Sequence, residues 1–398
     1  MRPVRTDVVV VGHICLDVLP SFAPGSGSPA DLFIPGKLTE VGPPVISTGG
    51  AVSNTGLALH RLGVSTRFVS KIGDDLLGRA VLDVLNGYGR DLADGMIMAP
   101  DEPTSYSVII NPQGVDRIIF HCPGANDTFH PSEVPPETLQ GARVLHFGYP
   151  PLMRRTYEDG GTALAEFFRQ ARTLGTFVSV DMAQPDPDSP AGRVDWIAWL
   201  ERVLPHVDFF GPSIDEILFM LGYRDKRLDA GNVDGDLLSE VSETLLRMGA
   251  RIVALKLGEH GLYLRTGATL DLPDREVPSG LAETWRDREM LSPCFQVNVK
   301  GTTGAGDCTL AGFLAGLVRR LPPEETLATA VGVGACSVEV ADAISGVPPL
   351  ATVQNRIASG WKHHPVALDL NDWCTDTTSS LWYGPNDRVR YTPSISPR

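Results

Sequence analysis

The chain has 398 residues, of which 42% are hydrophobic and 21% are charged, and its 41 glycines and 32 prolines are too few for a collagen or a low-complexity protein. It contains no apolar run of about 18 residues, which argues against a membrane span. A net charge of −14 repels phosphate backbones, so nucleic acid is not an expected partner.

The six cysteines are scattered and none form a CxxC pair, so neither a zinc site nor a disulfide framework is expected. The nine histidines also lack the spacing of metal ligands. The apolar run near the start is shorter than the core of a signal peptide and ends at Asp17. We therefore expect a first strand there and a cytoplasmic location.

Strand and helix patterns alternate from the start of the chain. Residues 8–11 are a run of valines, which predicts a strand buried on both faces. Gly49 and Gly50 are expected to open a helix that Gly63 ends, and a strand over 66–70 and an amphipathic helix follow.

Two β-rich runs, 105–111 and 117–121, flank a Pro-Gln-Gly turn, which is the pattern of a hairpin. Residues 20–48 are rich in Pro, Gly and Ser and are expected to be loop with short strands. We predict that a small β-sheet lid is built from about 20–48 and 103–123.

Beyond the hairpin the alternation continues, which predicts an α/β fold with a doubly wound, mostly parallel sheet flanked by helices. A long polar connection is expected over 266–293. One main domain is expected over 1–364, with an irregular C-terminal extension over 365–398. The further expected strands are 144–147, 177–181, 206–210 and 252–257, and the further expected helices are 157–174, 213–222 and 237–248.

The segment 297–309 reads VNVKGTTGAGDCT and combines a β-run, a glycine-rich turn and the start of an amphipathic helix. Free amides and the positive end of the helix dipole point the same way at such a turn, which favours an anion. The turn is not a P-loop, because Asp307 stands where Lys is required. The first strand lacks a GxGxxG fingerprint, which disfavours a dehydrogenase.

A carboxylate at an anion-binding turn repels the anion, so Asp307 needs another role. Accepting a proton from an alcohol is one such role, typically worth about 10²–10⁴ in rate. Capping the helix is the structural alternative. The neighbouring Cys308 lies where a thiol pKa tends to fall, but we expect it to be a packing residue.

The chain carries a series of motifs that resembles the ribokinase-like (PfkB) carbohydrate kinases. TTGAGD at 302–307, followed by Ala-Gly-Phe, resembles their C-terminal signature. Order and spacing agree from about residue 7 to 350. The other matching motifs are Gly12 with Asp17 (GxxxxD), GGAVSN at 49–54, GDDLLG at 73–78, GAN at 124–126 and KLGEHG at 256–261.

The resemblance implies a ribokinase-like fold and Mg²⁺-assisted transfer of a phosphoryl group from ATP to a hydroxymethyl group of a sugar or sugar-like polyol. It implies a lid that excludes water and that could pair between two copies in a homodimer. It assigns the general base to Asp307, the anion hole to the amides of Gly304, Ala305 and Gly306, substrate contacts to Asp17, Gly49, Gly50 and Asn54, ATP contacts to Lys256, Gly258, Gly261 and Thr303, and Mg²⁺ through water to Glu216.

Several assignments have a structural alternative. Asp17 suits a solvated turn, Asn54 a helix start, and Glu216 a solvated helix face. Gly258 and Gly261 suit an ordinary turn between strands.

Four positions depart from the family pattern. Ser213 replaces the Asn of the NxxE element that holds magnesium, and Gly301 replaces an Asp linked to a potassium site. Lys256 replaces a common Thr of the nucleotide loop. The strand that ends at Gly148 lacks the Glu of ribose-specific members, which argues against ribose.

Two other functions stay open. A nucleoside kinase of the same superfamily needs side chains that stack on a base, and Phe33, Tyr106 and Phe120 are candidates. A non-catalytic sugar- or nucleotide-binding protein is the other alternative, and the presence of Asp307 in the anion turn argues against it.

Overall fold

A computed structural model gives the fold of the chain. None of its described helices is long and apolar enough to cross a membrane. The described residues are 6–22, 33–111, 118–223, 225–229, 231–273, 283–376 and 379–389.

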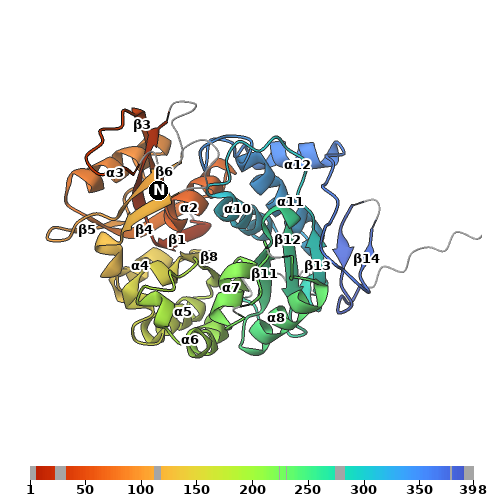
Figure 1. Cartoon of the computed structure of the whole chain (residues 1–398). Helices are drawn as coiled ribbons and strands as arrows, with labels where there is room; N and C mark the ends of the chain where they lie inside the picture. Colours follow the sequence, from red (N-terminus) through yellow and green to blue (C-terminus); the bar gives the residue numbers. More distant parts are fainter. Residues whose placement is uncertain are drawn as a thin grey trace, which may run out of the picture.

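The main sheet has 11 strands (Figure 1). The strands from β5 to β11 pair in parallel, and those from β11 to β14 pair antiparallel. The expected mostly parallel sheet is therefore confirmed. The order is β14 (Cys374–Thr375), β15 (Trp382–Tyr383), β13 (Glu289–Ser292), β12 (Leu262–Thr266), β11 (Ile252–Lys256), β10 (Phe209–Phe210), β9 (Phe177–Asp181), β8 (Val144–Gly148), β1 (Val8–Gly12), β4 (Thr66–Gly73) and β5 (Met96–Ala99).

The valine run of β1 is buried on both faces, as predicted. Val8 and Val10 belong to one hydrophobic core, whereas Val9 and Val11 belong to the other. Helices cover both cores, so the sheet is doubly wound (Figure 1). The first core is covered by α2 (Ala51–Arg61), α3 (Leu76–Tyr88), α10 (Ala305–Val318), α11 (Pro323–Ser337) and α12 (Leu350–Ala358), and the second by α4 (Pro136–Leu139), α5 (Thr162–Thr173), α6 (Trp196–Val203), α7 (Ile214–Met220) and α8 (Gly235–Arg247).

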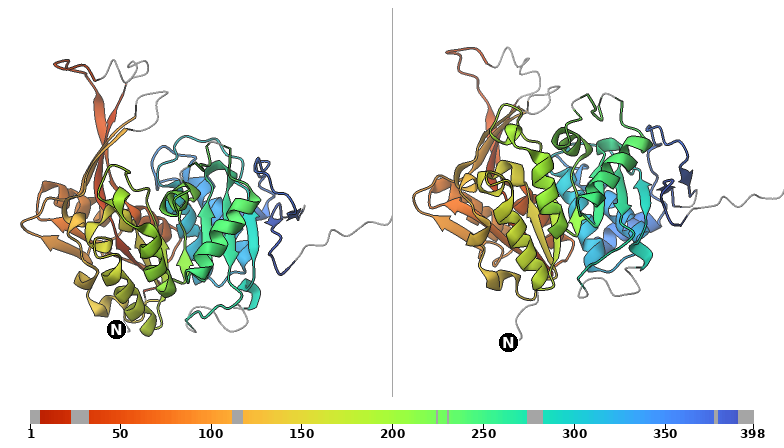
Figure 2. Two further views of the ribbon diagram at one scale, coloured as in Figure 1. Left: turned by 60° about the horizontal axis from the view of Figure 1, so that its bottom comes forward. Right: turned by 90° about the horizontal axis from the view of Figure 1, so that it is seen from below.

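A separate sheet of 4 strands forms the lid and stands out from the main body (Figure 2). The expected hairpin is its β6–β7 pair. The lid also includes Cys15 and Asp17, because the chain passes from β1 into β2 after Ile14. Residues 23–32 and 112–117 of the predicted lid lie outside the described residues. The order is β3 (Gly42–Gly49), β2 (Cys15–Ser21), β6 (Tyr106–Ile110) and β7 (Ile118–Cys122).

Two predicted elements are shorter than expected. The helix predicted over 157–174 begins only at Thr162, because Gly160 and Gly161 adopt left-handed φ values of 68° and 83° that end the preceding turn. The strand predicted over 206–210 is limited to β10, because 204–206 form a 3₁₀ turn around a proline.

The prediction of a polar connection over 266–293 is wrong at its end. Residues 289–292 form β13, which is buried throughout, and Trp285 is 2% exposed. The described part of the tail is mostly irregular, but β14 and β15 extend the main sheet beyond β13. Residues 377–378 and 390–398 of the tail lie outside the described residues.

Around the glycine-rich turn, two local predictions are also wrong. The run 297–299 forms no strand, and nearby Phe295 makes only an isolated bridge to His363. Helix α10 is buried on nearly all sides rather than amphipathic, because it packs between α2 and α11. The turn is therefore held by a helix inside the molecule.

Candidate active site

The candidate site lies where parallel strands end at their carboxyl edge. His13 follows β1, Tyr149 follows β8, Asp181 ends β9 and Lys256 ends β11. Strand β1 lies between β4 and β8, where the strand order reverses, and ligands of open α/β sheets bind at such a point. A cavity of ≈ 1510 Å³ opens there, and every site residue expected from the sequence lines it except Gly49.

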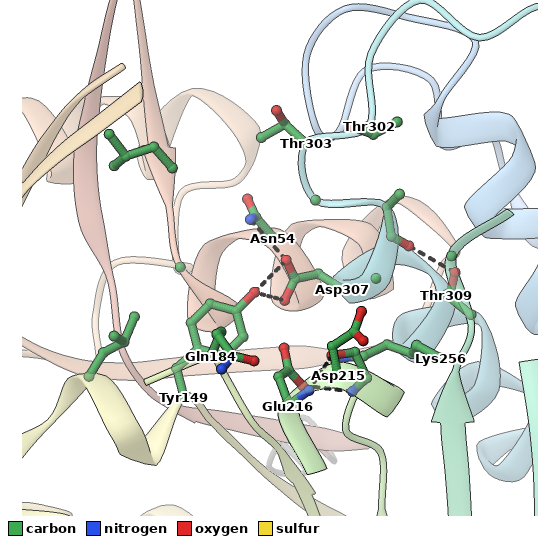
Figure 3. Close-up of a pocket in the computed structure, with 18 of the residues that line it drawn as sticks. Asn54, Tyr149, Gln184, Asp215, Glu216, Lys256, Thr302, Thr303, Asp307 and Thr309 are labelled. Atoms are coloured by element: carbon green, nitrogen blue, oxygen red, sulfur yellow. Dashed lines mark hydrogen bonds between the residues drawn. The ribbon is translucent and has the colours of Figure 1, made fainter. Parts of the chain in front are cut away.

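Asp307 lies in the first turn of α10 and faces this cavity, although it is only 3% exposed. Its Oδ1 accepts a hydrogen bond from Thr55 Oγ1 at 3.3 Å, and its Oδ2 accepts one from Asn54 Nδ2 at 3.1 Å. The Tyr149 hydroxyl lies 2.8 Å from both oxygens (Figure 3). The carboxylate is therefore fixed by three donors and does not cap its own helix.

Burial raises the pKa of Asp307 above its usual value. Lys256 and the hydrogen bonds from Tyr149, Asn54 and Thr55 oppose this effect, but burial outweighs them. A carboxylate with a raised pKa is a stronger base than an ordinary carboxylate. The site thus combines a tuned base with a position at the cavity wall.

Tyr149 contributes to this tuning, and its removal has a predictable effect on pH dependence. The Tyr149 hydrogen bond lowers the pKa of Asp307, so Tyr149→Phe should raise that pKa. A base works only when deprotonated, so the acidic limb of a kcat/KM profile should move to higher pH. Tyr223→Phe, which removes a surface hydroxyl bound to Glu240, is the control. An unchanged acidic limb in Tyr149→Phe would contradict the role of this hydroxyl.

The glycine-rich turn before α10 presents backbone to the cavity. Gly304 adopts a φ of 69°, and a Cβ there would lie 2.6 Å from Ala343 Cβ, so the position requires glycine. The amide of Ala305 donates to Thr302 O at 3.2 Å and is engaged in the turn itself. The amide of Gly306 lies in the first helical turn, where no preceding carbonyl of the helix is available to it.

At the lid side of the cavity, Asp17 is 8% exposed, and burial raises the pKa of its carboxyl. Its Oδ1 accepts a hydrogen bond from Cys15 Sγ at 3.3 Å. Gly49 lies beside it, because a Cβ at Gly49 would overlap the Asp17 carboxylate. Gly50 caps α2 with a φ of 86° and leaves room for the His13 ring.

Because Gly49 lies so close to Asp17, we expect a larger residue at position 49 to weaken acceptor binding selectively. Gly49→Ala should displace the carboxylate and raise KM for the acceptor by about 10-fold or more, with little change in KM for the nucleotide. Gly87→Ala on α3 is the matched control, because a Cβ there meets open space. Steady-state kinetics on both variants measure the effect, and an unchanged acceptor KM in Gly49→Ala would remove Asp17 from the binding site.

Lys256 lies among three carboxyl groups. Its Nζ is 2.5 Å from Oδ1 of Asp181, whose side chain is completely buried. Burial would lower the pKa of Lys256, but Asp181, Glu216 and Asp307 outweigh burial and raise it to about 12. Burial raises the pKa of Asp181, whereas Lys256 lowers it. Lys256 therefore stays charged. It pairs with Asp181 at the end of β9 and acts electrostatically on Asp307 and on Glu216 in the first turn of α7.

Glu216 has a structural role as well as a place on the cavity wall. Its Oε2 accepts a hydrogen bond from the Ser213 amide at 2.6 Å, and Ser213 Oγ accepts one from the Glu216 amide at 3.2 Å. This reciprocal pair is a capping box at the start of α7. Ser213, which departs from the family pattern, thus serves as the helix cap.

At the other end of the cavity, Gly258 and Gly261 flank a short turn after β11. Both adopt positive φ values, 54° and 107°. A Cβ at Gly261 would overlap the carbonyl oxygen of Ser292, so this glycine also allows β13 to approach. Apolar side chains line this end, among them Phe295, Val297, Val299, Val331 and Val338.

Several functional candidates were missed by sequence reasoning. Tyr149, Asp181 and His13 all come at or directly after the carboxyl end of a strand, and this position is the signal that could have revealed them. His121 on β7 also lines the cavity. Burial raises the pKa of Cys308, contrary to the tendency expected at a helix start, and its thiol donates to Ala343 O at 3.2 Å. Cys308 is therefore a packing residue.

Comparison with known proteins identifies a family that matches this chain. Residues 5–350 match the family model described as pfkB family carbohydrate kinase. A relative named as an uncharacterized sugar kinase of Archaeoglobus fulgidus is 27% identical over 294 residues, which is 73% of this chain and 98% of that protein. The 2-dehydro-3-deoxygluconokinase of Bacillus subtilis is 25% identical over 321 residues, 79% of this chain and 87% of that protein.

A solved structure shares the fold. The fructokinase of Xylella fastidiosa with bound ATP superimposes with a TM-score of 0.67 at 18% identity, covering 89% of this chain and 99% of that one. The resemblance drawn from the sequence motifs and the predicted ribokinase-like fold are both confirmed.

Proposed function

Because the chain belongs to the pfkB family of carbohydrate kinases, we propose that it transfers the γ-phosphoryl group of ATP to a hydroxymethyl group of a neutral sugar or polyol. The observation that carries this proposal is the position of Asp307. It lies at the start of α10, on the wall of a cavity that has Asp17 at one end and Gly258 at the other.

In the proposed reaction Asp307 accepts the proton of the acceptor hydroxyl while the oxygen forms a bond to the γ-phosphorus. The bond from the γ-phosphorus to the β–γ bridging oxygen breaks, and ADP leaves. The amides of Gly304 and Gly306, with the positive end of the α10 dipole, stabilise the charge on the transferring group. Ala305 shapes the turn, since its amide is bound to Thr302 O.

ATP fits the end of the cavity that holds Gly258, Gly261 and Thr303. The apolar side chains there offer a surface for the adenine, and the positive φ values of the two glycines let the nucleotide approach the backbone. Lys256 is a further cation beside the turn, because the Cβ position of Gly306 is 3.3 Å from Lys256 Cδ.

The carboxyl groups near Lys256 fit Mg²⁺, which prefers oxygen ligands and keeps much of its water. Asp181 Oδ2 is buried and lacks a hydrogen-bond partner, and Asp215 and Glu216 line the cavity. Glu216 would hold the ion through water. The ion would neutralise charge on the phosphates.

The charges at the acceptor end favour a neutral acceptor over a sugar acid. Among the described lining residues of that end, Arg154 is the permanent cation, and its Nε is 3.1 Å from Asp127 Oδ2 and 3.9 Å from Glu158 Oε2. Asp17 adds a carboxyl group. A sugar carboxylate would therefore lack a free cationic partner, whereas hydroxyl groups find donors and acceptors.

The positions of the aromatic side chains that were expected to stack on a nucleoside argue against a nucleoside kinase. Phe33 and Phe120 contact one another at a ring-centroid distance of 6.4 Å, and neither they nor Tyr106 line the described cavity. Pairing of two lids in a homodimer stays a prediction. It is supported by the exposed apolar side chains of the lid, namely Val45, Ile46, Ile119 and Phe120.

An ATP-turnover panel tests the proposed function. Neutral hexoses, pentoses and their polyols, the sugar acid 2-dehydro-3-deoxygluconate, and nucleosides would each be offered with Mg²⁺ and ATP. We expect ADP release and a phosphate ester, identified by mass spectrometry, with a neutral acceptor. Turnover with sugar acids alone or nucleosides alone would overturn the acceptor class, and no acceptor-dependent turnover in the panel would overturn the kinase proposal.

A further inference from the structure

A second cluster of reactive side chains lies at the acceptor end of the cavity, beneath the lid. His13 and Cys15 flank the step from β1 to β2, and His121 lies on β7. One potential ligand atom from each of these residues lies within 4.8 Å of the others. Sequence spacing gave no sign of this cluster, because the lid brings His121 to His13 and Cys15, which precede it by more than 100 positions.

His13 is the unusual member of the cluster. It is 2% exposed, and neither of its ring nitrogens has a hydrogen-bond partner in the structure. A buried polar group without a partner destabilises the fold, and a bound ligand would remove this cost.

The ring of His121 is held in place by a hydrogen bond at one of its nitrogens. Its Nδ1 lies 3.1 Å from Ser107 Oγ, which fixes the ring and leaves Nε2 available. Metal-binding histidines usually have their other nitrogen held in this way. The same Ser107 oxygen lies 3.7 Å from Cys15 Sγ, so one hydroxyl orients two members of the cluster.

We propose that His13, Cys15 and His121 form a binding site for Zn²⁺ at the acceptor end of the cavity. Two imidazoles and one thiolate suit zinc, whereas Mg²⁺ prefers oxygen ligands. Zinc bonds of about 2.0–2.3 Å place tetrahedral ligand atoms about 3.3–3.8 Å apart, so a small inward shift of β7 completes the site. The fourth position is open to water.

Binding requires the Cys15 thiol to lose its proton. In the structure this thiol donates to Asp17 Oδ1 at 3.3 Å and is buried. Zn²⁺ replaces the proton on sulfur, the S–H bond is exchanged for a Zn–S bond, and the proton passes to solvent. No electron transfer is involved.

A consequence rests on the proposed function. Zn²⁺ bound beside Asp17 would occupy space needed by the acceptor and would connect lid strand β7 to the body of the protein. Zn²⁺ should then inhibit competitively with the acceptor and not with ATP.

The site itself is tested without ATP or acceptor. Co²⁺ is titrated into the protein, and the expected result is one equivalent bound with a cobalt–thiolate charge-transfer band and the visible spectrum of a tetrahedral ion. One equivalent of Zn²⁺ should abolish both signals. Cys15→Ser should remove the charge-transfer band, and His121→Gln should weaken Zn²⁺ binding by about 10-fold or more.

Cys122→Ser is the matched control. Cys122 follows His121 on the same strand, so its side chain points to the opposite face of the lid, and binding should be unchanged. The site would be overturned if Co²⁺ failed to bind stoichiometrically. It would also be overturned if Cys15→Ser and His121→Gln bound the metal as tightly as the unsubstituted protein does. Stoichiometric binding without competition against the acceptor would support the site and overturn only its inhibitory consequence.

Discussion

Replacing Asp307 by asparagine should lower kcat by about 10²–10⁴ while the protein remains folded and binds ATP. The variant keeps the shape of the side chain but cannot accept the proton. The fold should tolerate it, because Asn54 Oδ1 is buried without a partner and can accept a hydrogen bond from the new amide once the Asn54 side chain turns over. Single-turnover phosphoryl transfer and a nucleotide-binding titration measure the two properties separately.

Asp236→Asn is the matched control for this experiment. Asp236 also lies in the first turn of a helix, α8, but it is exposed and is not among the residues lining the cavity. Its replacement should leave kcat unchanged. If Asp307→Asn kept near-normal turnover, Asp307 would not be the base and its role would be reduced to positioning.

Replacing Lys256 by methionine should destabilise the protein by about 3–5 kcal/mol, because it removes the partner of a completely buried carboxyl group. Asp181, Glu216 and Asp307 would then face one another without a cation, and their pKa values would rise. Carboxyl groups with raised pKa bind more protons in the folded state, so the loss should grow as pH increases. Urea unfolding at two pH values measures it.

A double-mutant cycle separates this electrostatic effect from lost packing. In the Asp181→Asn background, Lys256→Met should cost much less, because the buried charge that needed a partner is gone. Additive losses from the two substitutions would show that the Lys256–Asp181 pair does not stabilise the fold. The control is Lys226→Met, an exposed position that is not among the residues lining the cavity.

Much of the fold could be predicted from local patterns in the sequence. The valine run of β1 could be assigned because each of its side chains meets a core on one face or the other. The turn before α10 could be assigned because Gly304 needs a backbone conformation that other residues avoid. These features depend on residues that are close together in the chain.

The features that escaped prediction depend on distant partners. Strand β13 was not predicted because it contains Glu289, a charged residue. Glu289 is nevertheless completely buried, because Arg265 Nη1 lies 3.1 Å away and Ser239 Oγ donates a hydrogen bond to it. Strands β14 and β15 have 2 residues each, too few to show a period. The contacts of Asp181 with Lys256 and of Tyr149 with Asp307 likewise require the folded sheet.

The most direct test of the account is a crystal structure with a non-hydrolysable ATP analogue and the acceptor identified by the turnover panel. We expect γ-phosphate oxygens about 2.7–3.1 Å from the amides of Gly304 and Gly306. The acceptor hydroxyl should lie about 2.6–3.2 Å from the Asp307 carboxylate. A nucleotide whose phosphates bind away from the α10 turn, or an acceptor hydroxyl beyond reach of Asp307, would contradict the proposed mechanism.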